Sequence, residues 1–487
     1  MTATVPIAGA PTAGQVRGRL RRARRRHHSR SLGDFLTDAY MLAWLALMYG
    51  VAVVSAARDY LGSPSGGQAD PGERYWICVA AVLAGAGLAW QGLRAVGPLL
   101  ATPAAQTWLV SAPIDRRRWL LPGLGALLAG VAAGAAVLAV AVASLGARPD
   151  LGWAALVGAA YGAAGAALSV AAQGERGTGR ARRWPRLLGV AVIGVAAAVT
   201  LGVIGAHTAH AHLPPAALPA LPALPALPAL PALPATAVLA VIGLPLAGGS
   251  AVLAVRALPS LDRAALNGGA QLASAAVTAV VWLDPSLLSG MVQVRRWRRV
   301  GRVRSRRFLA GGRLWALLQA DLRRQLRRPA NLGIWVALAL AQYAVAIAVP
   351  SVAGAAHVIG AYLAADRLTG GLRTLSRSAG LRRAIGGDET TVRLVHLVVP
   401  ALGTALWWLA TRPAGGAHLV ALEVLVVAGV VAAAYRAAAR PPMAYGGTVV
   451  DTPFGLIPVD LLRQIARGPD LLAVLVIVQT VMPRLLG

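Results

Sequence analysis

Long apolar blocks recur along the chain, and the segments between them carry most of its charge. Blocks of about 20 residues are long enough to cross a bilayer as helices. The clearest blocks are 39–57, 75–93, 120–145, 151–172, 187–206, 236–255, 331–349, 394–411 and 418–435, with 352–365 and 471–483 as weaker ones. The pattern predicts an all-α fold, a polytopic transmembrane helix bundle of about 11 spans, within a range of about 10 to 12.

One further uncharged stretch, 264–283, has a polar start that includes Asn267 and Gln271. Polar residues at this position favour an interfacial or re-entrant helix over a twelfth span. Glycine patterns also occur inside the blocks, in GVAAG at 130–134 and GAAYG at 158–162. Glycines one turn apart allow neighbouring helices to approach closely in lipid, so both patterns predict helix packing.

Arginine sets the expected orientation. All 47 basic residues are arginine, and basic residues near span ends are retained on the cytoplasmic side. A cytoplasmic N-terminus leaves few arginines outside; these are Arg58, Arg74, Arg148, Arg412 and Arg484. We therefore expect a multi-pass protein of the cell membrane whose N-terminus is cytoplasmic.

The densest basic run is RRWRRVGRVRSRR at 295–307. In a chain with 57% hydrophobic residues, this run is best explained by contact with the anionic headgroups of membrane lipids. No folded nucleic-acid recognition module accompanies it, so nucleic acid is not an expected partner.

The blocks and loops suggest four segments. A basic cytoplasmic segment at 1–38 precedes a first transmembrane bundle at 39–255, which includes an external Pro-rich loop at 207–235. An Arg-rich cytoplasmic segment with a possible interfacial helix follows at 256–330, and a second bundle occupies 331–487. Within the external loop, residues 218–235 repeat LPA, which favours a polyproline II spacer, although slippage in a repetitive gene also explains the repeat.

Several kinds of chemistry are disfavoured. The chain has no lysine and so cannot carry a P-loop or a lysine Schiff base, and its single Cys78 excludes a disulfide framework. His207, His210 and His212 could bind metal, but no nearby carboxylate or thiol completes a site, so any binding is expected to be adventitious. We expect no catalytic residue, no cofactor and no resident metal, and the chain is not expected to be an enzyme.

Glu423 is the candidate intramembrane functional acid, because it lies well inside a clear apolar block. A role in a proton or substrate pathway is one interpretation. A structural pairing with His396, His418 or a backbone group is the other. His357 and His396 lie near block ends, where structural roles are expected.

The segments between blocks carry the most specific local patterns. They include WLVSAPIDRRRWL at 108–120, LDPSLL at 283–288, DLRRQLRRP at 321–329, VRLVHLVVP at 392–400 and TPFGLIPVDLLRQIARGPDLL at 452–472. Short helix-capable pieces set off by Gly or Pro are suited to lie on the inner membrane surface and accept a partner. Together these motifs resemble actinobacterial membrane proteins identified as type-2 ABC exporter permeases.

This resemblance implies an all-helical permease that pairs with a separate cytosolic ATP-binding subunit and moves a substrate outward, typically as a homo-oligomer. About 11 spans depart from the usual exporter half of about six, so one chain could supply both halves. The LPA repeat at 218–235 is a second departure from the usual exporter half.

The candidate ATPase contact is the basic elbow at 366–393, which joins two apolar blocks. Its arginines flank short helical pieces; they are Arg373, Arg377, Arg382 and Arg383. Two alternative functions stay open: a secondary, ion-coupled transporter, and a membrane-embedded enzyme acting on lipid-linked substrates. The loop at 58–74 holds Asp59, Asp70 and Glu73 but shows no recognisable catalytic spacing.

Overall fold

A computed structural model of the chain describes residues 71–99, 115–145, 150–174, 184–211, 235–261, 307–415, 420–440, 449–452, 455–458 and 466–486, with isolated positions at 15, 18–19, 22 and 266. Four sequence features fall wholly or mostly outside these residues. They are the apolar block 39–57, the LPA repeat, the stretch 264–283 and the arginine run that ends at 307.

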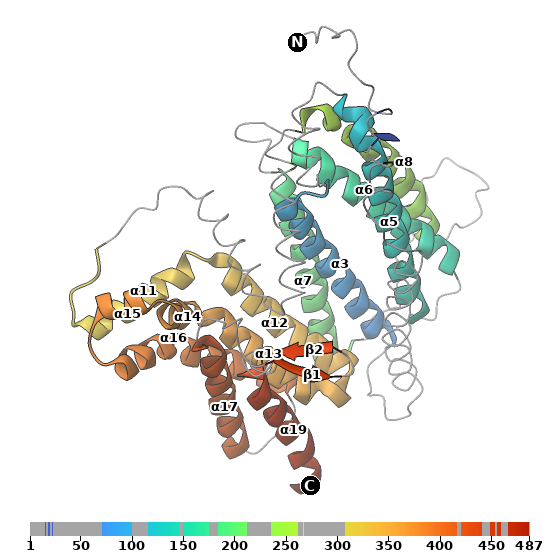
Figure 1. The fold of residues 1–487 in the computed structure, drawn as a ribbon. Coiled ribbons are helices and arrows are strands. Elements are labelled where there is room, and N and C mark those ends of the chain that lie inside the picture. The colour runs from blue at the N-terminus through green and yellow to red at the C-terminus, as the bar shows by residue number, and fades with distance from the viewer. Residues whose placement is uncertain are drawn as a thin grey trace. The chain divides into compact units, whose positions relative to one another are not determined.

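The chain forms two compact units (Figure 1). The first comprises residues 1–63, 70–199 and 212–295, and the second comprises 64–69, 200–211 and 296–487. The first unit contains α3 (Pro71–Val96), α5 (Arg116–Leu145), α6 (Leu151–Gly174), most of α7 (Trp184–Thr208), α8 (Ala235–Ala257) and the 3-10 helix η2 (Leu258–Ser260).

In the first unit α6 packs against both α5 and α8. A Cβ added at Gly162 would lie 2.6 Å from the Cβ of Ala135 on α5, and one added at Gly158 would lie 2.7 Å from the Cβ of Ala139. The packing predicted for GAAYG is therefore confirmed. The prediction for GVAAG is wrong within the described residues, because Gly130 and Gly134 have no neighbour within 4 Å of an added Cβ.

One end of the first unit has a small apolar core. Leucines from α5, η2 and the segment after α3 meet Val170 of α6; they are Leu99, Leu120, Leu124, Leu258 and Leu261. The Gln173 amide also bridges to Leu99, accepting from its N–H at 3.1 Å and donating to its carbonyl at 3.1 Å. This core fixes how the helices meet at that end.

The second unit contains α11 (Arg313–Leu326), α12 (Pro329–Ala348), η3 (Pro350–Val352), α13 (Ala353–Leu368), α14 (Gly370–Arg377), α15 (Ala379–Ile385), α16 (Glu389–Thr411), η4 (Arg412–Ala414), α17 (Val420–Ala438) and α19 (Pro469–Leu486). The 16-residue α13 is central, since it contacts α12, α16, α17 and α19. Small residues on α13 let the neighbouring helices approach it closely. At Gly360, for example, an added Cβ would lie only 2.8 Å from the ring of Trp407 on α16.

A short antiparallel hairpin interrupts the helical pattern between α17 and α19. It pairs β1 (Val449–Thr452) with β2 (Gly455–Pro458), with Val450 opposite Ile457. The sequence predicts short helical pieces here, and this is wrong for 449–452 and 455–458, which form strands. The helix α19 that follows is apolar but is not among the candidate spans of the described residues.

The all-α transmembrane class is confirmed. Among the described residues, eight helices are long and apolar enough to cross a membrane: α3, α5, α6, α7, α8, α12, α16 and α17. Their outward faces are apolar, as Leu402, Leu406 and Leu409 on α16 illustrate, each more than 60% exposed. Such surfaces suit lipid rather than water, so the protein is a multi-pass membrane protein.

Candidate functional site

The elbow between α13 and α16 consists of the two short helices α14 and α15. Ser378 caps α15, because its side chain accepts a hydrogen bond from the Leu381 N–H at 3.1 Å. Gly386 and Gly387 end α15 with φ of 67° and 71°, a left-handed conformation that favours glycine. The expected short helical pieces are therefore present, with local sequence reasons for their limits.

Asp388 starts α16 by capping its first turn. Its carboxylate accepts hydrogen bonds from the Thr391 N–H at 2.7 Å and from the Thr391 hydroxyl at 2.8 Å. These bonds favour the charged form and lower the pKa of Asp388. The elbow is thus joined to α16 by a fixed helix start.

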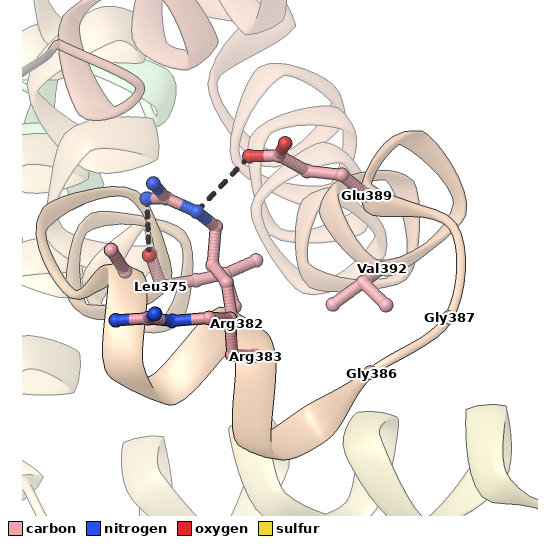
Figure 2. A pocket seen from close by; sticks show the side chains of 8 residues that line it. Leu375, Arg382, Arg383, Gly386, Gly387, Glu389 and Val392 are labelled. Carbon is pink, nitrogen blue, oxygen red and sulfur yellow. Dashed lines mark hydrogen bonds and ion pairs between the residues drawn. The ribbon is translucent and has the colours of Figure 1, made fainter.

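Two of the four candidate arginines hold the elbow together. Arg373 forms an ion pair with Asp366 of α13. Arg382 donates to the carbonyls of Leu375 at 3.2 Å and Ser376 at 2.7 Å, and forms an ion pair with Glu389 at 3.2 Å (Figure 2). These contacts connect α13, α14, α15 and α16, so the elbow is bonded to the helix on each side of it, one of which, α16, is a candidate span.

The other two candidates, Arg377 and Arg383, are exposed. Arg383 also lines a pocket of about 310 Å3, together with Arg382, Glu389 and Val392 (Figure 2). The structure therefore divides the four arginines: Arg373 and Arg382 stabilise the elbow, and Arg377 and Arg383 are exposed.

The helix α11 is tied to the same elbow. Arg313 at its start donates to the carbonyls of Ile385, at 2.7 Å, and Gly386. Asp321 at its middle is buried and bonds to buried His396 of α16. Gln325 near its end donates to the Leu368 carbonyl of α13 at 2.9 Å. We call this group of α11, α14 and α15 the basic end of the second unit.

Glu423 lies at the opposite end of the second unit. It is 8% exposed and forms an ion pair at 3.0 Å with Arg412, which follows α16. Neither predicted histidine partner is confirmed, because His396 bonds Asp321 at the basic end and His418 lies outside the described residues. The half-exposed guanidinium of Arg412 is therefore the counter-ion of the Glu423 carboxylate.

A polar cluster near Glu423 was not foreseen. His357 of α13 shares a hydrogen bond of 2.9 Å with the Thr411 hydroxyl and stacks on Trp408, with ring centroids 3.9 Å apart. The Gln342 amide of α12 donates to the carbonyls of Ala353 at 3.0 Å and Ala414 at 2.9 Å. The signal available in the sequence was the isolated glutamine in an otherwise apolar helix.

Metal binding gains no support from the described part of the chain, where no group of three or more His, Cys, Asp or Glu side chains could hold an ion. His207 ends α7, and His210 adopts a left-handed φ of 51° just after it. His212 lies outside the described residues.

Comparison with known proteins gives one result. A family described as a family of unknown function, DUF6297, matches residues 67–448, which is well over half of the chain. The chain belongs to the DUF6297 family. No curated protein and no solved structure matches it. The region shared with DUF6297 includes α11, the whole elbow and Glu423, whereas α19 follows it.

Proposed function

We propose that this DUF6297 protein is the membrane subunit of an exporter that is driven by a separate cytosolic ATPase. The observation that carries the proposal is the elbow of α14 and α15, which is bonded to α13 and α16 and presents exposed arginines. A partner can drive a membrane pathway only through elements that move together with the spans. The elbow meets this requirement.

Three further points support the proposal. The lysine-free chain has no P-loop lysine for ATP phosphates, so transport driven by ATP would need an ATPase on another subunit. The motifs of the elbow and the neighbouring loops resemble those of type-2 ABC exporter permeases. The basic end is rich in arginine, which places it in the cytoplasm under the expected orientation.

The test is charge reversal at the two exposed arginines. Arg377→Glu combined with Arg383→Glu should lower the amount of ATPase that co-purifies from native membranes by about tenfold or more, because like charges at a contact are repulsive. Arg19→Glu combined with Arg22→Glu is the matched control, since both of these arginines are exposed and lie in the N-terminal segment, outside the motifs that resemble the permeases. The control should retain the partner.

Failure is easily recognised in this design. Equal retention of the partner by both double variants would exclude the elbow as the docking site. If no ATPase accompanies the unmodified protein, the exporter proposal fails. The purified chain alone should hydrolyse no ATP in either case.

Orientation is tested separately. Under the proposal, a reporter inserted in the repeat at 218–235 reports an external location and one inserted near Ser305 reports an internal location. If both report the same side, the number of spans between these positions must be revised, and the elbow is no longer placed in the cytoplasm by the arginine count.

A secondary, ion-coupled transporter is the second candidate function, and the polar cluster around His357 favours it. Buried polar groups between spans are typical of substrate and ion pathways. Transport measured in vesicles discriminates the two: an exporter requires ATP and its partner, whereas a secondary transporter responds to an imposed ion gradient alone.

A further inference from the structure

The helix α11 has its polar and apolar faces reversed relative to a helix on a soluble protein. Its buried residues are Gln319, Asp321 and Gln325. Four of its six large apolar side chains are exposed, whereas Leu317 and Leu318 are half-buried, and two more exposed ones lie just before the helix. The six exposed side chains are Phe308, Leu309, Leu314, Trp315, Leu322 and Leu326, all between 47% and 68% exposed. Water is a poor solvent for such a face.

The buried polar side chains of α11 are all bonded, and Asp321 and Gln325 fix how the helix is rotated, because they bond α16 and α13. The Gln319 amide exchanges hydrogen bonds of 2.9 and 3.2 Å with the backbone of Leu309. Asp321 bonds His396 of α16 and forms an ion pair with Arg324 at 2.9 Å. Rotating the apolar face inward would break these buried contacts, so that face must remain outward.

The position of α11 in the chain places it at the membrane boundary. Only two residues, Arg327 and Arg328, separate it from α12, a candidate span. Its contact with His396 lies two turns into α16, just beyond the charged pair formed by Glu389 and Arg393. The outward face of α11 therefore lies at the depth where the spans leave the bilayer.

The charge on α11 identifies the chemistry of what covers it. Residues 313–328 contain arginines at five positions, Arg313, Arg323, Arg324, Arg327 and Arg328. The only acid among these residues is Asp321, which is buried and paired. A basic helix with a Trp- and Leu-rich outer face matches an interface of acyl chains and anionic headgroups.

We propose that α11 is an interfacial helix whose face of Leu314, Trp315, Leu322 and Leu326 inserts into the bilayer, with exposed Arg327 at its C-terminal end contributing to the binding of anionic lipid headgroups. Because Arg313, Asp321 and Gln325 bond the elbow, α16 and α13, the lipid environment of α11 is connected to those elements. The proposal depends on the membrane character of the protein and is independent of the ATPase.

The test uses a fluorescent label at single cysteines. Cys78 is the only cysteine, so Cys78→Ser provides a background for Leu322→Cys and Leu326→Cys, with Ala384→Cys on exposed α15 as the control. The full chain is labelled with bimane and reconstituted in vesicles of phosphatidylcholine and phosphatidylglycerol. Bimane at 322 and 326 should be quenched by lipids with acyl-chain nitroxides, and bimane at 384 by aqueous acrylamide.

Two outcomes would overturn the proposal. Strong acrylamide quenching at 322 and 326 would show that the face is in water. Weak quenching by both reagents would show that protein covers it, whether a second copy or another partner.

The headgroup preference is tested at the same labelled position. Bimane at 326 should be quenched more by headgroup-labelled phosphatidylglycerol than by headgroup-labelled phosphatidylcholine. Arg327→Gln should reduce that preference by up to about fivefold, since each basic residue at an anionic surface contributes about 1 kcal/mol. Arg383→Gln should leave it unchanged. An unchanged preference in Arg327→Gln would contradict the role assigned to Arg327.

Discussion

In the first unit the closest contacts between helices are made by small residues, whereas in the second unit several polar bonds also join helices that are far apart in the sequence. In the first, Gly158 and Gly162 bring α6 directly against the backbone and alanines of α5. In the second, Asp321 and Gln342 bridge between helices at opposite ends. A buried polar bridge fixes the register between two helices, because its donor and acceptor satisfy each other only at one alignment.

The largest expected effect comes from breaking the buried contact at the basic end. Asp321→Ala leaves His396 and Arg324 without their carboxylate and should destabilise the protein by about 3 kcal/mol. Thermal unfolding of the detergent-purified protein measures this. Asp115→Ala removes an exposed ion pair and the cap of α5, and should cost only about 1 kcal/mol. If the two variants were destabilised equally, the buried contact of Asp321 would contribute no more to stability than an exposed one in the first unit.

Next in size is disruption of the close helix contact in the first unit. Gly158→Leu places a side chain against the backbone of α5 and should cost about 1–3 kcal/mol. Gly130→Leu is the matched control, because no neighbour lies within 4 Å of an added Cβ there. The two variants should differ in thermal stability. If Gly158→Leu is as stable as the control, α5 and α6 are not held by this contact.

Two buried glutamines of the second unit lead to opposite predictions, because one lacks hydrogen bonds to the described residues and the other forms two. Gln479 of α19 is 2% exposed, and neither of its amide atoms has a hydrogen-bond partner in the described part of the chain. Gln479→Leu should therefore stabilise the protein by about 1 kcal/mol. Gln342→Leu removes two hydrogen bonds to carbonyls and should destabilise it by a similar amount. Unfolding midpoints should move in opposite directions.

A rise in stability accompanied by loss of transport in Gln479→Leu would indicate that the amide has a functional role. A fall in stability would show that the amide has bonding partners in the folded protein.

The smallest effect is expected at Glu423. Its ion pair with Arg412 is partly solvated, since that arginine is about half exposed, so Glu423→Gln should change stability by less than about 1 kcal/mol. Transport and its dependence on pH are the decisive measurements, because the substitution removes charge with little change of shape. Unchanged transport at every pH would leave only a structural role.

The helical class and most helix limits follow directly from hydrophobic patterning. Blocks such as 151–172 and 331–349 coincide with α6 and α12. A single apolar segment of about 20 residues in lipid can pair all its backbone N–H and C=O groups only by forming a helix. The sequence also predicts the short elbow helices, since Gly370 lies at the start of α14 and Gly386 follows α15. The pairing of Glu423 with Arg412 was not predicted, because the sequence does not show which basic side chain lies near a given carboxylate.

What the sequence determined by itself, then, was the set of helices and the segments rich in arginine. The tertiary structure decided which polar groups meet. His396 bonds Asp321 across 75 positions of the chain, and Arg373 and Arg382 support the elbow while Arg377 and Arg383 remain exposed. Hydrophobic periodicity is a local property of the chain, whereas an ion pair depends on the register between two helices. That register is set by packing, which no local pattern encodes.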